Sequence, residues 1–438
     1  MSVLKKILIA NRGEIAVRII RACKLQDITS VAVYSTADKQ AMHVAMADES
    51  VCIGGPNPED SYLNQQALIA AAQITHADAI HPGYGFLSEN ADFAKLCEEQ
   101  NIKFIGPSSH VISIMGEKAA ARETMIKAGV PVIPGTETDF LDEADAKKAA
   151  LEIGYPVMLK ASAGGGGKGM RVIESEKEFD TQFELAQAEA KAAFGDGHMY
   201  LEKFLAHPRH IEVQVAADQF GNAIAIGERD CSLQQRHQKV IEEAPASTLD
   251  EQTRQEMYDV SVKAAEDINY EGLGTMEFLF DGPGKFYFME MNTRVQVEHP
   301  ITELTADVDL VDLQIKIAQG EPIPFAEIDR HNFALECRIN AKTAGKIDAL
   351  HLPAGHGIRT DSALYQGYFV PANYDSMIAK VISYGSDRET AIKQMEAALD
   401  KTVIGGIKTN LDFLIQVIQE PDYRINHTDI GWLDKLAN

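Results

Sequence analysis

Polar and apolar side chains alternate through the stretch Phe286–Pro300, which reads FYFMEMNTRVQVEHP. Successive side chains of an extended strand point to opposite faces, so every second residue shares a face. The mostly apolar face would comprise Tyr287, Met289, Met291, Thr293, Val295 and Val297. The other face would carry two carboxylates, two amides and a guanidinium, from Glu290, Asn292, Arg294, Gln296 and Glu298. An ordinary half-buried strand places mixed small polar residues outward, so this row of reactive groups indicates a functional site.

The same row is too long to act from one straight strand. At ~3.3 Å per residue the five groups would spread over roughly 26 Å, and they could not all meet one small molecule. We therefore expect the chain to bend into a loop near Thr293.

The first quarter of the chain alternates short apolar strands with helices. A strand at Ile7–Ala10 precedes a turn at Asn11–Gly13, and apolar residues at helical spacing then predict an amphipathic helix, with Ile15, Ile19, Ala22 and Cys23 on its buried face. Further elements are predicted as strands at Val31–Tyr34, Val51–Ile53, Ala79–His81 and Phe104–Gly106, with a helix around Leu68–Ile74. This alternation predicts a mostly parallel, doubly wound, Rossmann-like sheet. The first turn has one glycine instead of Gly-x-Gly-x-x-Gly, so a bound dinucleotide is not expected.

A glycine-rich segment follows two predicted helices, Glu117–Ala128 and Glu143–Ile153. The punctuated stretch Gly129–Gly135 between those helices indicates a domain boundary. The strand Tyr155–Lys160 then leads into the sequence ASAGGGGKG. Backbone N–H groups of a glycine run can approach phosphate oxygens closely. Met170 follows where a Walker loop needs Ser or Thr, so the segment is either another kind of phosphate-binding flap or a solvated linker.

Two predicted strands and a charged segment occupy the middle of the chain. The strand His207–Val215 returns after a turn as Ala223–Gly227. The segment Glu228–Lys239 is dense in charge and has few helix or strand cues. We interpret it as a long polar connection, which in a region rich in core residues is more often functional than decorative.

A predicted hairpin comes next, after a helix over Asp250–Ile268. Its strands are Thr275–Phe280 and Lys285–Met291. We set its register by placing Phe280 opposite Lys285.

That register predicts a metal site. It places Glu277 opposite Phe288 and diagonal to Glu290, about 7–8 Å away and within reach of a shared cation. Two glutamates and Asn292 form a hard, all-oxygen ligand set that suits magnesium or manganese bound to nucleotide phosphates. Either glutamate alone would more often be a solvated edge residue, but the other polar groups of the row favour the metal site.

The last quarter of the chain changes pattern after Gly320. Predicted elements are strands at Phe333–Ile339, Tyr368–Val370 and Ser376–Ile382, and helices at Arg388–Leu399 and Asn410–Ile418. This mixture indicates an α+β domain packed on the preceding one.

Composition narrows the class of protein. The chain has 438 residues, of which 45% are hydrophobic and 24% charged, as expected for a globular protein of two or three domains. A formal net charge of −24 argues against a nucleic-acid or anionic-membrane partner, although clustered Lys and Arg can still attract a small anion. Five scattered cysteines without Cys-x-x-Cys spacing indicate free thiols in a reducing cytoplasm. No apolar run approaches the ~20 residues that span a bilayer, and the N-terminus lacks a signal-peptide pattern.

Seven motifs together resemble the biotin carboxylase family, a member of the ATP-grasp fold, over essentially the whole chain. They are IANRGEIA (9–16), HPGYGFLSEN (81–90), KASAGGGGKGM (160–170), ERDCS (228–232), RHQK (236–239), EMNTRVQVEHP (290–300) and ECRIN (336–340). The resemblance implies an α/β and α+β multidomain chain with a Rossmann-like N-terminal domain (1–115), an ATP-grasp domain (116–325) with a lid at about 134–204, and a mixed α+β C-terminal domain (326–438). It also implies ATP-dependent carboxylation of biotin by bicarbonate, with the glycine flap closing over the nucleotide.

The resemblance assigns site residues by their place in these motifs. The nucleotide would be held by Lys118, Lys160, Gly166, Gly167, Glu202, Lys203, Phe204, Leu205, His210, Gln234 and His237. Magnesium or manganese, as two ions, would be held by Glu277, Glu290 and Asn292. The bicarbonate pocket would be formed by Arg294, Gln296 and the backbone of Val297, and Tyr84 would lie near biotin. The residues that act in the chemistry would be Lys239, Arg294, Glu298 and Arg338.

The resemblance also implies how these groups act. Glu298 would remove the proton of bicarbonate, whose oxygen then attacks the γ-phosphate of ATP to give carboxyphosphate. That intermediate would release carbon dioxide and a phosphate that deprotonates biotin, while Arg338 stabilises the enolate. The alternative for Arg338 is a structural ion pair with Glu336 or another acid.

The resemblance also implies partners. It has no Met-Lys-Met biotin-attachment sequence, so biotin would come on a separate carrier protein, with a carboxyltransferase as the second partner and a homodimer as the expected assembly. The final acceptor could be acetyl-CoA, as in fatty acid synthesis, or pyruvate or another acyl-CoA. The family's longer loop is reduced here to Ala341–Ala344, which puts in doubt how the biotin side of the pocket and the dimer contacts are built.

Two other functions are compatible with parts of the pattern. Another ATP-grasp ligase would activate a different carboxylate and pass it to an amine, but the Arg294–Glu298 pocket suits bicarbonate. A catalytically silent nucleotide-binding protein would not need the complete metal, base and lysine set.

Overall fold

The structure is a computed structural model that describes residues 4–136, 139–162 and 170–436. Contacts divide the chain into two compact units, Met1–Val130 with Arg209–Asn438, and Pro131–Pro208. The second unit contains the predicted lid segment, and each unit is described by itself. Within the described residues, no helix is both long enough and apolar enough to cross a membrane.

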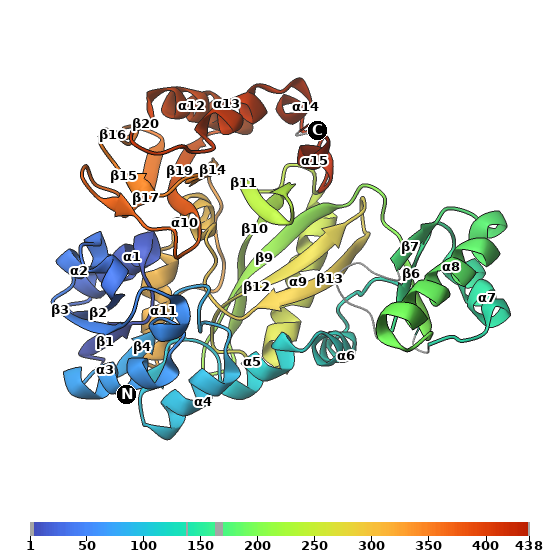
Figure 1. Ribbon diagram of the computed structural model, residues 1–438, viewed down its shortest axis with the longest axis horizontal. Coiled ribbons are helices and arrows are strands. Elements are labelled where there is room, and N and C mark those ends of the chain that lie inside the picture. Colours follow the sequence, from blue (N-terminus) through green and yellow to red (C-terminus); the bar gives the residue numbers. More distant parts are fainter. Residues whose placement is uncertain (1–3, 137–138, 163–169, 437–438) are drawn as a thin grey trace. The chain divides into compact units, whose positions relative to one another are not determined.

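The N-terminal part of the first unit is a parallel sheet with the strand order β3-β2-β1-β4-β5 (Figure 1). Its strands are β1 (Lys6–Ile9), β2 (Thr29–Ser35), β3 (Glu49–Gly54), β4 (Ala79–His81) and β5 (Lys103–Phe104). The connecting helices are α1 (Gly13–Leu25), α2 (Met42–Met46), α3 (Gln65–Thr75), α4 (Ala91–Glu99) and α5 (Ser109–Gly116), with short 3-10 turns η1 (Thr36–Asp38) and η2 (Pro58–Asp60). All neighbouring strands run parallel, which confirms the doubly wound prediction.

The second sheet of this unit has eight antiparallel strands in the order β13-β12-β9-β10-β11-β14-β19-β17. These are β9 (Arg209–Ala217), β10 (Ala223–Gln235), β11 (Gln238–Ala244), β12 (Gly272–Phe280), β13 (Phe286–Asn292), β14 (Phe333–Asn340), β17 (Ile358–Ser362) and β19 (Met377–Gly385). The link between β11 and β14, with Glu242 opposite Glu336, joins the middle of the chain to its last quarter. The C-terminal strands therefore extend the preceding sheet, whereas the sequence predicted a separate domain packed on it.

Helices and small strand pairs complete this part of the unit. The helices are α6 (Lys118–Ala128), α9 (Glu251–Asp267), α10 (His299–Ala306), α11 (Leu310–Ala318), α12 (Arg388–Lys401), α13 (Leu411–Gln419), α14 (Pro421–Arg424) and α15 (Trp432–Leu436). The paired short strands are β15 (Gly345–Lys346) with β18 (Phe369–Val370), and β16 (Leu350–His351) with β20 (Val403–Ile404). The shortened connection after β14 is tied to the neighbouring chain segment, because Lys342 N donates to Lys408 O at 2.7 Å.

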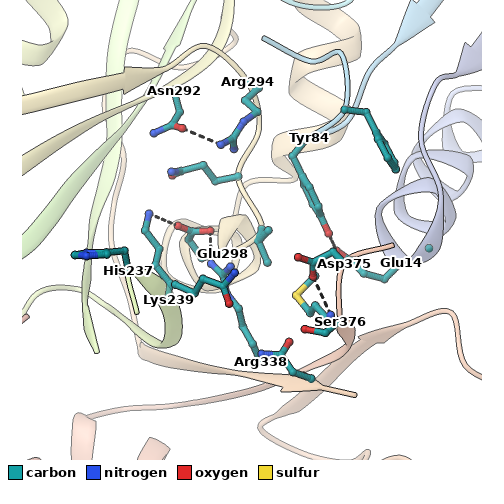
Figure 2. A pocket seen from close by; sticks show the side chains of 18 of the residues that line it. Glu14, Tyr84, His237, Lys239, Asn292, Arg294, Glu298, Arg338, Asp375 and Ser376 are labelled. Atoms are coloured by element: carbon teal, nitrogen blue, oxygen red, sulfur yellow. Dashed lines mark hydrogen bonds and ion pairs between the residues drawn. The ribbon is translucent and has the colours of Figure 1, made fainter. Parts of the chain in front are cut away.

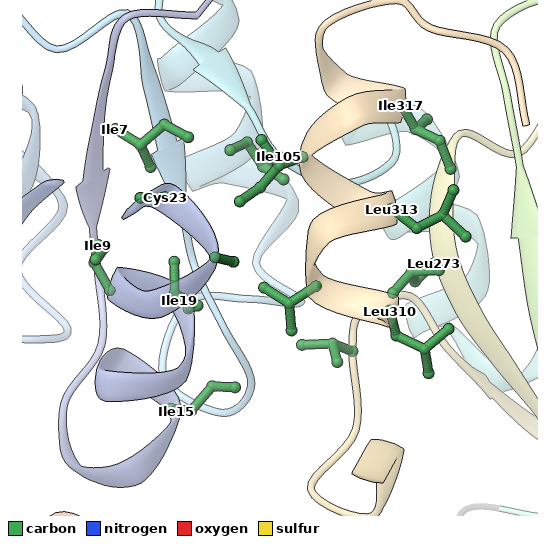
Figure 3. Close-up of a cluster of buried hydrophobic side chains, with 14 of the residues drawn as sticks. Ile7, Ile9, Ile15, Ile19, Cys23, Ile105, Leu273, Leu310, Leu313 and Ile317 are labelled. Carbon is green, nitrogen blue, oxygen red and sulfur yellow. The ribbon is translucent and has the colours of Figure 1, made fainter. Parts of the chain in front are cut away.

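A shared hydrophobic core joins the parallel sheet to the larger one. Ile15 and Ile19 of α1 are buried in one cluster with Leu310 and Leu313 of α11 and Leu273 of β12 (Figure 3). This confirms the predicted amphipathic face of α1. Because burial of such side chains stabilises by roughly 1.5–3 kcal/mol each, the cluster fixes the N-terminal sheet against the sheet that follows.

The charged segment Glu228–Lys239 forms strands, so its prediction as a polar connection is wrong. It comprises the second half of β10, a tight turn at Arg236 and His237, and the start of β11. Both turn residues have positive φ, 52° and 64°. The strand cues are weak because buried charged side chains such as Arg229 replace the apolar residues that usually mark a central strand.

The register predicted for the hairpin is also wrong. Phe280 pairs with Phe286, and Glu277 lies directly opposite Glu290 instead of diagonal to it. Lys285 lies opposite Asp281, one residue later on the first strand than expected, since Asp281 N donates to Lys285 O at 2.8 Å. A β-bulge then leaves Met289 without a partner on β12.

The bulge also changes which side chains of β13 are buried. Phe286 and Phe288 lie in the core, whereas Met289, predicted on the apolar face, is 42% exposed. Met289 and Glu290 both line the cavity described below. Strict alternation failed here because the extra residue shifts the phase of the strand.

The second unit is a three-stranded antiparallel sheet covered by two helices. Its elements are α7 (Glu143–Ile153), β6 (Val157–Ala161), β7 (Met170–Ile173), α8 (Glu176–Phe194) and β8 (Met199–Lys203). The sequence analysis located α7 and β6 but assigned no element to α8.

Candidate active site

A cavity of about 640 Å³ opens beside the eight-stranded sheet (Figure 2). Its walls come from the segments that follow β1 and β4, from β9 to β14 and from the segment before β19. Among the sequence-predicted site residues it brings together Tyr84, His210, Gln234, His237, Lys239, Glu277, Glu290, Asn292, Arg294, Gln296, Val297, Glu298 and Arg338. Tyr84 and Arg338, which are 254 positions apart in the chain (338 − 84), therefore share one concave surface. Their chemical roles remain predictions.

The row of polar groups leaves the strand where we expected. β13 ends at Asn292, and α10 begins at His299. The intervening loop is held by Glu89, whose carboxylate accepts from Thr293 N at 3.1 Å and from Arg294 Nε at 2.8 Å. This bend lets the later groups of the row converge on the cavity instead of extending along a strand.

Glu298 lies between two cations at the N-terminus of α10 (Figure 2). Its Oε1 accepts from Lys239 Nζ at 2.7 Å, and its Oε2 accepts from Arg338 Nη2 at 2.9 Å. Only 2% of the residue is exposed. Burial alone would raise the pKa of Glu298, but Lys239 and Arg338 lower it overall. The carboxylate is thus ionised and able to accept a proton.

Lys239 joins three carboxylates. Besides Glu298, its Nζ lies 2.5 Å from Glu212 Oε2 and 2.9 Å from Glu277 Oε1. Burial opposes its charge, but Glu212 and Glu298 raise the pKa of Lys239 well above its usual value. The ammonium is therefore permanent, and it neutralises the acidic floor of the cavity.

Arg338 forms a structural ion pair, but its partner is Glu242 and not Glu336. Its Nε lies 2.6 Å from Glu242 Oε1, while Glu336 accepts no hydrogen bond from any described residue. The same guanidinium also reaches Glu298 and lines the cavity. Arg338 can therefore form a structural ion pair with Glu242 and still be available for its predicted role in the cavity.

Arg229 is a buried organiser of the site that the sequence analysis missed. It is fully buried, and its Nη2 donates to Gln296 Oε1 at 2.5 Å while its Nε donates to Glu212 Oε1 at 2.5 Å. A further bond from Nη1 to Thr302 Oγ1, at 2.8 Å, ties it to α10. The motif ERDCS contained Arg229, but the interpretation of that segment as a polar connection without strands gave no sign of its buried position.

The predicted metal ligands lie together on the paired strands β12 and β13. Asn292 Nδ2 donates to Glu277 Oε1 at 2.9 Å, and Glu290 faces Glu277 across the pair. Burial would raise the pKa of Glu277, but Lys239 and His210 hold it far below its ordinary value. Burial and the neighbouring Glu277 raise the pKa of Glu290, against the charge of Lys118.

This donor set fits a hard divalent cation. The raised pKa of Glu290 means that its negative charge is not fully neutralised by the protein, which a cation would correct. The amide oxygen of Asn292 accepts from Arg294 Nη2 at 2.8 Å and would have to exchange that partner for the metal.

His210 contacts the same glutamates from β9. Its Nε2 lies 3.2 Å from Glu277 Oε2 and 3.5 Å from Glu212 Oε2. Burial lowers and the carboxylates raise the pKa of His210, with a net value of about 9. The imidazole therefore carries a proton, which favours an ion pair over metal ligation even though the three residues are grouped closely. Gln234 Nε2 lies 3.2 Å from His210 Nδ1.

Tyr84 lies on the wall of the cavity across from Glu298. Its side chain points toward Glu14 of α1 (Figure 2). Its hydroxyl donates to Glu14 Oε1. Glu14, Asp375 and Ser376 line this wall, and none of them was predicted. Their signal was weak because single Glu, Asp and Ser residues in loops and helix starts are common.

Among the remaining predicted nucleotide residues, Lys118 does not line this cavity. Lys118 is the first residue of α6 and acts on Glu290 through its charge. Gly166 and Gly167 lie outside the described residues.

The others belong to the second unit. The Lys160 ammonium pairs with Glu202 across β6 and β8, and Lys203 Nζ donates to Gly154 O at 2.8 Å. Phe204 N donates to Pro156 O at 3.1 Å, and Leu205 is buried.

Comparison with known proteins agrees with this arrangement. Residues 3–112 match the family model "Biotin carboxylase, N-terminal domain", residues 117–326 match "Carbamoyl-phosphate synthase L chain, ATP binding domain", and residues 336–435 match "Biotin carboxylase C-terminal domain". The biotin carboxylase of Pseudomonas aeruginosa is 51% identical over 99% of this chain and 98% of its own length. A subunit of the pyruvate carboxylase of Methanothermobacter thermautotrophicus is 48% identical over 98% of this chain and 89% of its own length.

A solved structure extends the likeness to three dimensions. The biotin carboxylase domain of Hydrogenobacter thermophilus 2-oxoglutarate carboxylase has a TM-score of 0.87 and 46% identity, covering 100% of this chain and 98% of that one. That domain was solved as a dimer in complex with MgADP, ADP and bicarbonate.

The ATP-binding match, the antiparallel sheet and the cation-flanked carboxylate define an ATP-dependent ligase. The chain belongs to the biotin carboxylase family, and it supplies the biotin carboxylase activity of a biotin-dependent carboxylase.

Proposed function

We propose that the protein carboxylates biotin on a separate carrier protein, using ATP and bicarbonate and passing through carboxyphosphate. The observation that carries this proposal is the buried carboxylate of Glu298, held between Lys239 and Arg338 in the cavity. Bicarbonate is a weak nucleophile until it loses its proton, and Glu298 is ionised and lies beside the predicted bicarbonate pocket, where it would take that proton.

Bicarbonate would bind where Arg294 and Gln296 line the cavity beside Glu298. The Arg294 guanidinium offers planar donors to the anion, and the bond from Arg229 fixes the oxygen of Gln296, so that its Nε2 keeps a set direction. After proton transfer to Glu298, an oxygen of bicarbonate attacks the γ-phosphorus of ATP, ADP leaves, and carboxyphosphate forms.

Carboxyphosphate then separates into carbon dioxide and phosphate. The released phosphate takes the proton from the ureido nitrogen of biotin, and that nitrogen attacks carbon dioxide. Arg338 keeps its positive charge throughout and would stabilise the enolate oxygen of biotin, with Tyr84 on the facing wall.

Nucleotide binding would use the residues that the family motifs assign to it. The residues assigned to ATP by these motifs are Lys118, Lys160, Glu202, Lys203, Phe204, Leu205, His210, Gln234 and His237. Two divalent ions, Mg²⁺ or Mn²⁺, would be held by Glu277, Glu290 and Asn292, and they would neutralise phosphate charge during transfer.

We further propose that the chain acts as a homodimer with a biotin carboxyl carrier protein and a carboxyltransferase. The acceptor we propose is acetyl-CoA, which would place the protein in cytoplasmic fatty acid synthesis. Relatives named for pyruvate and 2-oxoglutarate carboxylation make those acids the alternative acceptors.

One assay tests the core of this proposal. ATP cleavage by the purified chain is expected to require bicarbonate and to rise when free biotin is added. ATP turnover that is indifferent to both compounds would contradict the proposal. Supplying a purified carrier domain and then each candidate acyl-CoA or 2-oxoacid with its carboxyltransferase would identify the acceptor.

A further inference from the structure

A fully buried lysine reaches the main chain next to Glu298. Lys380 lies on β19 with no exposed surface, and its Nζ donates to the carbonyl oxygen of Val297 at 2.7 Å. That carbonyl belongs to the peptide bond between Val297 and Glu298. Lys380 therefore fixes the backbone at the point where the predicted base leaves the loop and enters α10.

Glu14 connects the same lysine to the other wall of the cavity. Its Oε1 lies 3.2 Å from Lys380 Nζ and also accepts from the Tyr84 hydroxyl. Glu14 is 7% exposed and belongs to the first turn of α1. The side chains thus form a continuous chain of polar contacts from Tyr84 through Glu14 and Lys380 to the Val297 carbonyl.

The surroundings of Lys380 keep this contact charged. Burial opposes the charge, but Glu14, Glu336 and Asp361 raise the pKa of Lys380 overall. Asp361 lies opposite Lys380 on β17, with its Oδ2 3.9 Å from the ammonium. Since a buried ammonium is costly unless it is paired and hydrogen-bonded, its bond to the Val297 carbonyl is part of what satisfies it.

We propose that Glu14 and Lys380 are positioning residues that couple the Tyr84 wall of the cavity to the peptide carrying Glu298. Lys380 holds that peptide so that the carboxylate stays between its two cations. Glu14 holds Lys380 and Tyr84 in a fixed relation, so a molecule pressed against Tyr84 acts on the position of Glu298. The inference rests on the proposed function, because Glu298 and Tyr84 have the roles given there.

The test compares four variants of the full chain: Lys380→Met, Glu14→Gln, Tyr84→Phe and the double variant Tyr84→Phe/Lys380→Met. Bicarbonate-dependent ATP cleavage gives kcat and the KM for bicarbonate, and calorimetry gives the affinity for ADP. Lys380→Met is expected to lower kcat/KM for bicarbonate by up to about 100-fold, as a misplacement near 1 Å would, with ADP affinity unchanged. Tyr84→Phe is expected to raise the KM for bicarbonate although Tyr84 lies on the other wall.

The double variant decides between coupling and two independent effects. Coupled residues give a combined loss smaller than the product of the single losses, whereas independent residues multiply within about twofold. Multiplicative losses, or a folded Lys380→Met with unchanged bicarbonate kinetics, would overturn the inference. Glu14→Gln keeps the shape of the side chain and a hydrogen-bond acceptor, so it reports on the charge alone. If Lys380→Met does not fold, Glu14→Gln/Lys380→Met removes both charges together and takes its place.

A control pair separates position from stability. Half-buried Arg388 of α12 and buried Glu243 of β11 form another ion pair, 2.8 Å apart, and neither lines the cavity. Arg388→Met/Glu243→Gln is expected to lower thermal stability without changing the KM for bicarbonate. A wild-type chain without bicarbonate-dependent ATP cleavage would refute the proposed function itself, whereas an active wild type with kinetically normal Lys380→Met would refute only the coupling.

Discussion

Replacing Glu298 with glutamine removes the predicted base while keeping its shape. The carboxylate accepts one bond from Lys239 and one from Arg338. Hydrogen bonds to charged groups are worth about 1.5–3 kcal/mol each. The amide oxygen can keep one of the two, but the amide NH₂ would then face the donor of the other.

The loss of stability should nevertheless be modest. Lys239 keeps Glu212 and Glu277, and Arg338 keeps Glu242, so neither cation is left unpaired. Removing the buried charge of Glu298 also recovers desolvation energy, which leaves a net cost of roughly 1–3 kcal/mol. Against a typical stability of about 5–15 kcal/mol the variant remains folded.

The catalytic loss should be larger than the structural one. General-base catalysis contributes about 10²–10⁴-fold, equivalent to about 3–5 kcal/mol of barrier. We therefore expect Glu298→Gln to bind ADP normally by calorimetry while bicarbonate-dependent ADP release, followed by a coupled enzyme assay, falls at least about 100-fold.

A matched control lies on the same helix. Glu303 of α10 is also buried between two cations, Arg18 at 2.8 Å and Arg359 at 2.6 Å, but it does not line the cavity. Glu303→Gln should lose comparable stability and keep its turnover. Glu298→Gln with turnover within about threefold of wild type would refute the assignment of Glu298 as the base.

Two other substitutions test the electrostatics of the site. Glu290→Gln removes one of the three predicted metal ligands, so we expect the Mg²⁺ concentration needed for half-maximal ADP binding to rise about tenfold, and an unchanged Mg²⁺ dependence would exclude Glu290 as a ligand. Burial and neighbouring carboxylates raise the pKa of Glu242 to about 7, against the effect of Arg338. Because the folded-state pKa of Glu242 lies above the unfolded value of 4.5, the protonated group stabilises the fold below pH 4.5, and this stability is lost as the pH rises toward 7. Glu242→Gln should remove this dependence, so the free energy of unfolding from denaturant titrations should change by up to roughly 3 kcal/mol less over this range than in the wild type. If the free energies of unfolding of the variant and the wild type changed equally with pH, Glu242 would not be the source of the loss of stability.

Sequence patterns predicted local elements well where one periodicity dominated. The parallel N-terminal strands, the amphipathic α1 and the bend after Asn292 follow from spacing alone. The polar row also predicted which side chains meet in the cavity, because the bend and the sheet bring its groups together.

The predictions that were wrong share a physical cause. The structure of these segments is determined by contacts with residues far away in the sequence, which leave no local pattern. β10 and β11 carry buried charges such as Arg229 and Glu242, which only make sense once their partners on other strands are known. The bulge at Met289 depends on how the hairpin turn closes. Glu14 and Lys380 were not predicted as site residues because their contact joins positions 366 residues apart (380 − 14).

The pairing of β11 with β14 has a consequence for where such a chain can be divided. Family boundaries place β11 in the ATP-binding segment and β14 in the C-terminal one, yet their main chains share four aligned residue pairs. Arg338 reaches Glu298 only because this seam is closed. Separating the two segments would open a central strand edge, which is prone to wrong pairing. Main-chain hydrogen bonds therefore join the ATP-binding and C-terminal segments, and the ion pair between Arg338 and Glu298 crosses the same seam.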